Sequence, residues 1–287
     1  MENKSKKLLK TLVKLLITGL ALYFVFSNIS WSEVRGLLLN ADFTFLIIAI
    51  LFFAFSKALS AFRLQVFFKA IPLFISNRYN LKLAWVGMFY NLFLPGGIGG
   101  DGYKVYLLKN KQGVGVKLLV QAMLLDRVSG LISLLILAGI GFLFLDLSIL
   151  PNWIRVLDLI GLVLAVPAFY LLTKVLFKTF DKVVIVSLIW SFGVQLMQVI
   201  SAVLILKALG ISKSYIAYCV LFLVSSFVSI LPFTIGGLGS REFTFMIGYQ
   251  YFGIEESFSI ALSLLFTLIS ALVSFGGVFM RFKDDES

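Results

Sequence analysis

Long runs of apolar residues alternate with short polar segments along the whole chain. Eight runs stand out, at about 11–28, 43–64, 80–94, 118–145, 153–173, 183–207, 215–231 and 257–280. A helix needs roughly 20 apolar residues to cross a bilayer, and most of these runs are long enough. The pattern predicts an all-α polytopic membrane protein, with residues 1–287 forming a single transmembrane domain.

Composition strengthens this interpretation. The chain is 60% hydrophobic and only 14% charged, with a mean hydropathy of +1.03. Ordinary soluble domains are about 25% charged, and one of this size cannot bury so much apolar surface. The net charge of +11 comes from lysines and arginines in short loops between the apolar runs. We interpret these loops as topology signals and expect the bilayer, not nucleic acid, as the partner.

The distribution of basic residues predicts the orientation. Five lysines between Lys4 and Lys14 precede the first apolar run, and cytoplasmic loops are rich in lysine and arginine. We therefore expect both termini of a multi-pass protein in the cytoplasm, and we expect the cytoplasmic (inner) membrane of a prokaryote. The basic and then apolar N-terminus is interpreted as a retained signal anchor, because no small-residue cleavage site follows it.

Two glycine-rich stretches indicate an internal repeat. The stretch PGGIGGDGYK begins at Pro95, and PFTIGGLGSR begins 137 residues later at Pro232. They align without a gap, and the same offset carries the four apolar runs of the first half close to the four of the second. This agreement predicts repeat one at about 8–145 and repeat two at about 146–282.

Orientation makes the two repeats antiparallel. Basic residues flank the run at 80–94 on both sides, so this segment is expected to enter the membrane and turn back. Each half then has three full crossings plus one re-entrant or broken helical hairpin, about six full spans in all. Because three is odd, the halves point in opposite directions, as in many alternating-access carriers. If both arms of each hairpin crossed the membrane fully, each half would still have an odd number of crossings.

Composition also restricts the chemistry. There is no histidine and one cysteine, Cys219, which removes histidine-based catalysis and most metal sites. Gly97, Gly99 and Gly102 formally match a dinucleotide-binding turn, but long apolar runs flank them instead of a βαβ unit. Lys104 is followed by Val105, so the phosphate-loop pattern fails too. We expect no cofactor, no metal and no enzymatic activity.

The glycine motifs suggest a wet cavity at membrane depth. Pro95 and Pro232 are expected to end helices, and the glycines permit tight turns and approachable amides. Irregular backbone is tolerated in a bilayer only inside protein or along a cavity, and helix N-termini attract anions. The structural alternative is close helix packing through small residues.

Charged residues accompany these motifs. An ionisable group at membrane depth is costly and is therefore a candidate for function, although an ion pair or a snorkelling side chain is the plain alternative. Lys57 and Arg63 lie late in the second apolar run; Lys57 is interpreted as snorkelling, and Arg155 and Asp158 as interfacial anchors. The charged candidates are Asp101, Lys104, Asp126, Arg127, Arg241 and Glu242.

Uncharged polar residues recur on two helical faces. Ser187, Ser191, Gln195 and Gln198 follow one another at spacings of 4, 4 and 3. Interhelical hydrogen bonding and a hydrophilic lining for a headgroup both explain such a stripe. The candidate polar lining comprises Asn91, Ser187, Ser191, Gln195, Gln198, Ser225 and Ser229.

Three stretches together carry a family resemblance. LPGGIGGDGYKVYLLKN, LLDRVSG and LPFTIGGLGSREF resemble, in this order, the lysylphosphatidylglycerol synthase/flippase transmembrane family. The resemblance implies lipid translocation or a related membrane role, and it argues against lysyl transfer by this chain alone because the soluble aminoacyltransferase domain of bifunctional members has no counterpart here. The substrate-binding residues that it implies are Gly99, Gly100, Asp101, Tyr103, Lys104, Asp126, Arg127, Gly236, Gly237, Gly239, Arg241 and Glu242.

The leading hypothesis is a flippase-like carrier for a phosphate-bearing lipid, aminoacylated or polyprenyl-linked. The expected partners are this phospholipid or polyprenyl-phosphate lipid, the bilayer, and a second copy of the chain or a synthase or glycosyltransferase. Two alternatives stay open. One is a secondary transporter of a small anion, and the other is a membrane component of a lipid-modifying or glycosyl-transfer system.

Overall fold

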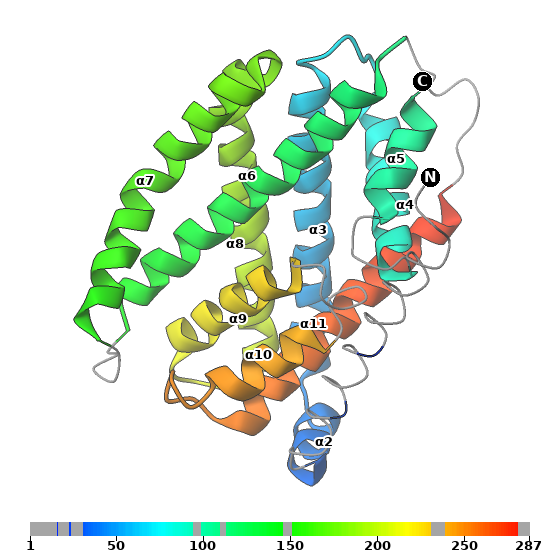
Figure 1. Ribbon diagram of the computed structural model, residues 1–287. Helices are drawn as coiled ribbons and strands as arrows, with labels where there is room; N and C mark the ends of the chain where they lie inside the picture. Colours follow the sequence, from blue (N-terminus) through cyan, green and yellow to red (C-terminus); the bar gives the residue numbers. More distant parts are fainter. Residues whose placement is uncertain are drawn as a thin grey trace.

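Helices are the regular secondary structure in the part of the chain that the structure describes. The computed structural model describes residues 31–93, 99–109, 113–145, 151–230 and 239–280, together with Leu16 and Tyr23. These ranges contain no strand. The prediction of an all-α polytopic membrane protein is confirmed (Figure 1).

Five helices in the described ranges are long and apolar enough to cross a membrane. They are α3 (Phe43–Phe68), α6 (Val116–Leu143), α7 (Asn152–Leu176), α8 (Val184–Ala208) with the preceding 3₁₀ turn η1 (Lys178–Val183), and α11 (Glu256–Phe275) with the following 3₁₀ turn η2 (Gly276–Phe279). They match five of the six expected full spans to within a few residues. The remaining expected span, 11–28, lies outside the described residues except for Leu16 and Tyr23.

Shorter helices occupy the regions of the two glycine motifs. Helices α4 (Asn77–Phe93) and α5 (Gly99–Leu108) pack against each other, and so do α9 (Tyr215–Ile230) and α10 (Ser240–Gly248). Helical hairpins therefore occur in both places where the sequence predicts them. The residues at their tips, 94–98 and 231–238, lie outside the described ranges, and so do both motif prolines. One more short helix, α2 (Trp31–Leu39), precedes α3.

Helices α3 and α8 run antiparallel along most of their lengths. The amide of Asp42, just before α3, donates to the carbonyl of Ala208 at the end of α8, at 2.9 Å. Further along, Ser201 Oγ donates to the carbonyl of Ala49, also at 2.9 Å. The residue numbers of the partners on α8 thus fall as those on α3 rise, which makes the helices antiparallel. Figure 1 shows the two helices side by side. Small buried residues such as Ala49 and Ser201 permit this close approach.

In each half of the chain, one long helix packs against a short helix of the other half. Helix α6 of the first half packs on α9 of the second, and α11 with η2 of the second half packs on α4 of the first. Figure 1 shows that α6 and α11 both cross the molecule obliquely. Two repeats related by a two-fold axis would give such an exchange. The boundaries 8–145 and 146–282 stay a prediction that this packing supports.

Helix α7 lies at the edge of the bundle (Figure 1). Only 11% of its most apolar stretch is buried, against 56% for α11. Apolar side chains such as Trp153, Val163 and Val175 are more than half exposed. In a membrane protein these side chains face lipid.

Candidate functional site

A cavity of about 310 Å³ lies where the two hairpins approach each other. Five helices from both halves of the chain contribute to it, namely α3, α4, α6, α9 and α11. Its walls combine two cations, three hydroxyls, an amide and apolar side chains. The lining residues are Lys57, Met88, Asn91, Leu92, Arg127, Ser229, Ile230, Ser270 and Ser274.

Lys57 supplies a positive charge in the middle of a membrane span. It follows the first residue of α3 by 14 positions and precedes the last by 11, so about 17–21 Å of helix separates it from either end. Its ammonium group lies 4.5 Å from the centre of the Phe53 ring. No hydrogen bond or ion pair joins it to another side chain in the described ranges. The expectation that Lys57 snorkels to the cytoplasmic end is corrected, because its side chain lines the cavity.

Lys57 was missed as a site residue because the apolar run that predicts the second span ends before the helix does. A span of 43–64 places Lys57 near one end, whereas α3 continues to Phe68. Ser270 and Ser274 were missed as well. Their spacing of four in α11 places them on one helical face, and this signal was present in the sequence.

Asp101 binds two cationic side chains, one on the first hairpin and one on α6. Its carboxylate accepts a hydrogen bond from Arg127 Nε at 2.5 Å and one from Lys104 Nζ at 3.2 Å. Arg127 also lines the cavity. The aliphatic part of Lys104 packs on Gly87 of α4. Asp101 therefore fixes one wall of the cavity through Arg127 without lining it.

Asn91 joins the two arms of the first hairpin. Its side-chain oxygen accepts a hydrogen bond from the amide of Gly100 at 2.8 Å, while the residue lines the cavity. A Cβ on Gly100 would collide with the carbonyl group of Gly87, so this glycine serves close packing of α4 on α5. Tyr103 packs on the ring of Tyr90, with centroids 4.2 Å apart, and does not line the cavity.

Asp126 belongs to a separate polar network between α3, α6 and α8. It pairs with Arg63, whose Nη1 also donates to Ser191 Oγ at 3.2 Å. Ser191 donates in turn to Ser129, and Gln195 donates to the carbonyl of Gly130. Arg63 is thus paired in the interior of the bundle.

The polar stripe on α8 is consequently used for hydrogen bonds within the protein. Ser187 donates to the carbonyl of Val184 on its own helix, and Gln198 is half-buried one turn beyond Gln195. None of the four stripe residues lines the cavity.

Arg241, the counterpart of Lys104 in the second motif, is held by its neighbours. Its Nη1 donates to Ser226 Oγ at 3.0 Å and to Ser225 Oγ at 3.4 Å. The guanidinium lies over the rings of Phe222 and Phe266, at 5.3 and 4.8 Å. It has no carboxylate partner in the described part of the chain.

The carboxylate of Glu242 accepts hydrogen bonds from groups of the protein itself. One carboxylate oxygen accepts from the amide of Gly239 at 2.9 Å, and the other accepts from Ser263 and Thr267 at 3.1 Å each. The residue is 2% exposed. It ties the start of α10 to α11. Gly239 has a φ of 80°, which favours glycine, and forms the N-cap of α10.

Asn91, Arg127 and Ser229 are thus the predicted residues that line the common cavity. Gly236 and Gly237 lie outside the described residues. Two cations, Lys57 and Arg127, line the cavity, and no carboxylate is among its lining residues. This lining favours an anion in the cavity.

Comparison with known proteins agrees with this architecture. Residues 11–277 match the family described as the lysylphosphatidylglycerol synthase TM region. A relative from Methanothermobacter thermautotrophicus, named as a UPF0104 membrane protein, is 22% identical over 311 aligned residues. The alignment covers 91% of each chain.

Proposed function

We propose that this chain, which belongs to the lysylphosphatidylglycerol synthase transmembrane family, translocates a phosphate-bearing lipid across the membrane. The headgroup binds in the cavity between the hairpins, and the alkyl chains remain in the bilayer. One observation carries the proposal: Lys57 presents an ammonium group to this cavity at mid-membrane depth, with no acidic partner among the described residues. An ionisable residue there is costly unless function retains it.

The cavity walls suit a phosphate group. Lys57 is a compact cation with three donors, and Arg127 is a planar donor that Asp101 holds in place. Ser270 and the Asn91 amide add uncharged donors to the same walls, while the Ser229 hydroxyl donates to the carbonyl of Ser225 at 2.7 Å. Hydrogen bonds from cations to phosphate oxygens are about twice as strong as neutral ones. The site therefore replaces part of the hydration that the phosphate loses on entering the membrane.

The arrangement of the halves suggests how the cavity changes sides. Lining residues come from both halves, so rocking one half against the other would open the cavity alternately to each face. The antiparallel α3–α8 pair is the natural axis of this motion, because the other helices pack reciprocally around it.

Helix lengths favour re-entrant hairpins in this mechanism. Helix α5 has 10 residues and α10 has 9, so they are about 15 and 13 Å long. The hydrocarbon core is about 30 Å thick, which is twice these lengths. In the proposed topology the hairpins enter from opposite faces, both termini are cytoplasmic, and the protein resides in the inner membrane of a prokaryote.

Leaflet exchange in vesicles tests the proposal. Purified protein is reconstituted with fluorescent phosphatidylglycerol, an aminoacylated analogue or a short polyprenyl phosphate, and the fraction of label reduced from outside is followed over time. The wild type should exceed protein-free vesicles for at least one of these lipids. Rates equal to those of protein-free vesicles for all of them would reject the proposal.

Variants of Lys57 connect this activity to the cavity. Lys57→Met keeps an unbranched side chain of similar length and removes the charge, and it should slow exchange by about 10- to 100-fold, the range for one hydrogen bond to a charged group. Lys57→Arg should retain part of the rate. Lys207→Met, an exposed lysine at the end of α8, is the matched control and should leave the rate unchanged. Equal rates for Lys57→Met and Lys207→Met would contradict the site.

The alternatives predict different results, one in the same vesicles and the other in cells. A small-anion transporter would accumulate radiolabelled inorganic phosphate or carboxylate without moving lipid. A component of a lipid-modifying system would change lipid composition in cells that lack the gene, whereas a flippase would change only the leaflet in which the lipid is found.

A further inference from the structure

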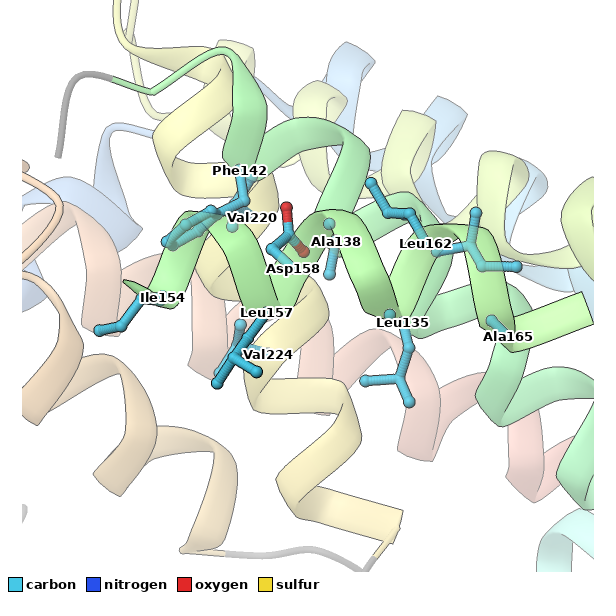
Figure 2. A pocket seen from close by; sticks show the side chains of 13 residues that line it. Leu135, Ala138, Phe142, Ile154, Leu157, Asp158, Leu162, Ala165, Val220 and Val224 are labelled. Carbon is cyan, nitrogen blue, oxygen red and sulfur yellow. The ribbon is translucent and has the colours of Figure 1, made fainter. Parts of the chain in front are cut away.

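A second pocket, separate from the cavity around Lys57, opens between α6, α7 and α9. Its volume is about 450 Å³, within the range of small-molecule sites, and it shares no lining residue with that cavity. Figure 2 shows side chains from the three helices around it. Apart from one carboxylate its walls are apolar. The residues that line it are Leu135, Ile136, Ala138, Gly139, Phe142, Ile154, Leu157, Asp158, Gly161, Leu162, Ala165, Val220 and Val224.

Asp158 is the one charged group in this pocket. Figure 2 shows its carboxylate pointing from α7 into the pocket, toward α6. The approach to α6 is close, since a Cβ on Gly139 would lie 2.6 Å from Asp158 Oδ1. Asp158 Oδ2 is buried and has no hydrogen-bond partner in the part of the chain that the structure describes. The sequence-based interpretation of Asp158 as an interfacial anchor does not explain a carboxylate turned inward.

The neighbouring cation does not neutralise Asp158. Arg155 lies one turn earlier on α7, and its guanidinium donates to the carbonyl of Leu145 at 3.0 Å, in the connection after α6. No ion pair involves Asp158 within the described ranges. A carboxylate in an apolar pocket without a hydrogen-bonded counter-charge is destabilising, so a cation brought from outside would gain free energy by binding there.

The pocket is open to the bilayer. Leu135 and Leu157 line it and are 45% and 56% exposed, on the face of the bundle where α7 meets lipid. Asp158 follows the first residue of α7 by six positions, about 9 Å along the helix. Because α7 is about 37 Å long and the hydrocarbon core about 30 Å thick, Asp158 lies near the edge of the hydrocarbon. A lipid headgroup can reach this depth while its chain enters the pocket.

We propose that this pocket binds a membrane lipid that carries a primary ammonium group. One alkyl chain occupies the apolar space between α6, α7 and α9, and the ammonium donates a hydrogen bond to Asp158. An anionic headgroup would be repelled by the carboxylate, and a quaternary ammonium has no N–H to donate. The site does not depend on the translocation activity proposed above, because the two pockets share no residue.

Photocrosslinking tests the proposal. The protein is reconstituted in vesicles that contain phosphatidylethanolamine, phosphatidylcholine or phosphatidylglycerol with a diazirine on one acyl chain, and labelled peptides are mapped by mass spectrometry. Phosphatidylethanolamine should label the pocket residues about tenfold more than either other lipid, as expected for one hydrogen bond between charged groups. Equal labelling by phosphatidylethanolamine and phosphatidylcholine would overturn the proposal, and so would the absence of pocket labelling.

Two variants separate the carboxylate from the pocket. Asp158→Asn should lower labelling by phosphatidylethanolamine to the level of phosphatidylcholine. Glu255→Gln, an exposed residue before α11, removes the same charge elsewhere and should change nothing. Gly161→Leu fills the pocket, and it is compatible with the fold because a Cβ at Gly161 meets no atom within 4 Å. It should abolish labelling by all three lipids.

The controls keep the outcome decisive. Each variant is compared with the wild type by thermal unfolding, so that loss of labelling in a folded protein is attributed to the pocket. If Asp158→Asn does not fold, the lipid preference of the wild type and the effect of Gly161→Leu still decide the question. Labelling by phosphatidylethanolamine that persists in folded Asp158→Asn would refute the role of the carboxylate.

Discussion

Arg63 on α3 and Asp126 on α6 form a two-pronged ion pair inside the helix bundle. Nε lies 2.7 Å from Oδ1, and Nη2 lies 3.0 Å from Oδ2. Arg63 is 7% exposed, and its Nη1 packs against Gly130, where a Cβ would lie 2.6 Å away. The pair joins two spans at membrane depth, so its loss should be felt in stability.

Removing one partner of this pair should destabilise the protein strongly. We expect Asp126→Asn or Arg63→Met to lower the free energy of unfolding by about 3–5 kcal/mol, because each leaves a buried charge unpaired. The measurement is reversible unfolding in mixed micelles. The double variant Arg63→Met/Asp126→Leu should be closer to the wild type than either single change, since both charges are gone. Arg35→Met, at an exposed position of α2, is the control. Single changes no worse than this control would contradict the prediction.

Two neighbouring glycines of the first motif should respond oppositely to alanine. Gly100→Ala should destabilise the hairpin, because its Cβ would collide with the carbonyl of Gly87 on α4. Gly102→Ala should be neutral or stabilise by up to about 1 kcal/mol, since its Cβ meets nothing within 4 Å and alanine favours a helix. Melting temperatures of the two variants in the same detergent decide the matter. Equal losses in both would mean that Gly102 also serves close packing.

Glu242 should act on stability and not on the lipid. Glu242→Gln removes the charge from a carboxylate that accepts three hydrogen bonds, and it should cost about 1–3 kcal/mol. Faster amide hydrogen exchange at the start of α10 should accompany the loss. Glu255→Gln is the exposed control and should match the wild type. A Glu242→Gln protein with unchanged melting and slower leaflet exchange would instead support contact between Glu242 and the headgroup.

Cysteine labelling should reveal opposite orientation of the two hairpins. In a Cys219→Ala background, single cysteines at Phe74 and Lys117 flank the first hairpin, and those at Lys213 and Glu255 flank the second. All four positions are exposed. A membrane-impermeant maleimide should label the first pair from the cytoplasmic side and the second pair from the outside. Labelling of all four from one side would refute the inverted repeat.

Several features of this protein are determined by its sequence alone. The span boundaries could be predicted because the length of an apolar run is a local property that the bilayer thickness selects. The positions of the two hairpins followed from similar logic, since a proline beside several clustered glycines disfavours continuation of a helix. The 137-residue offset aligned α3 with α8, and these two helices do pack along each other.

The partners of the charged residues were decided only by the tertiary structure. Asp126 pairs with Arg63 on another helix, while Lys57, six positions earlier than Arg63 on α3, lines the cavity. Long side chains can reach several neighbours, and the choice depends on how helices distant in sequence cross. Asp158 shows the same limit, because only the packing of α7 on α6 turns its carboxylate inward. Sequence determined which groups lie in the membrane, and the crossing of the helices determined what each of them meets.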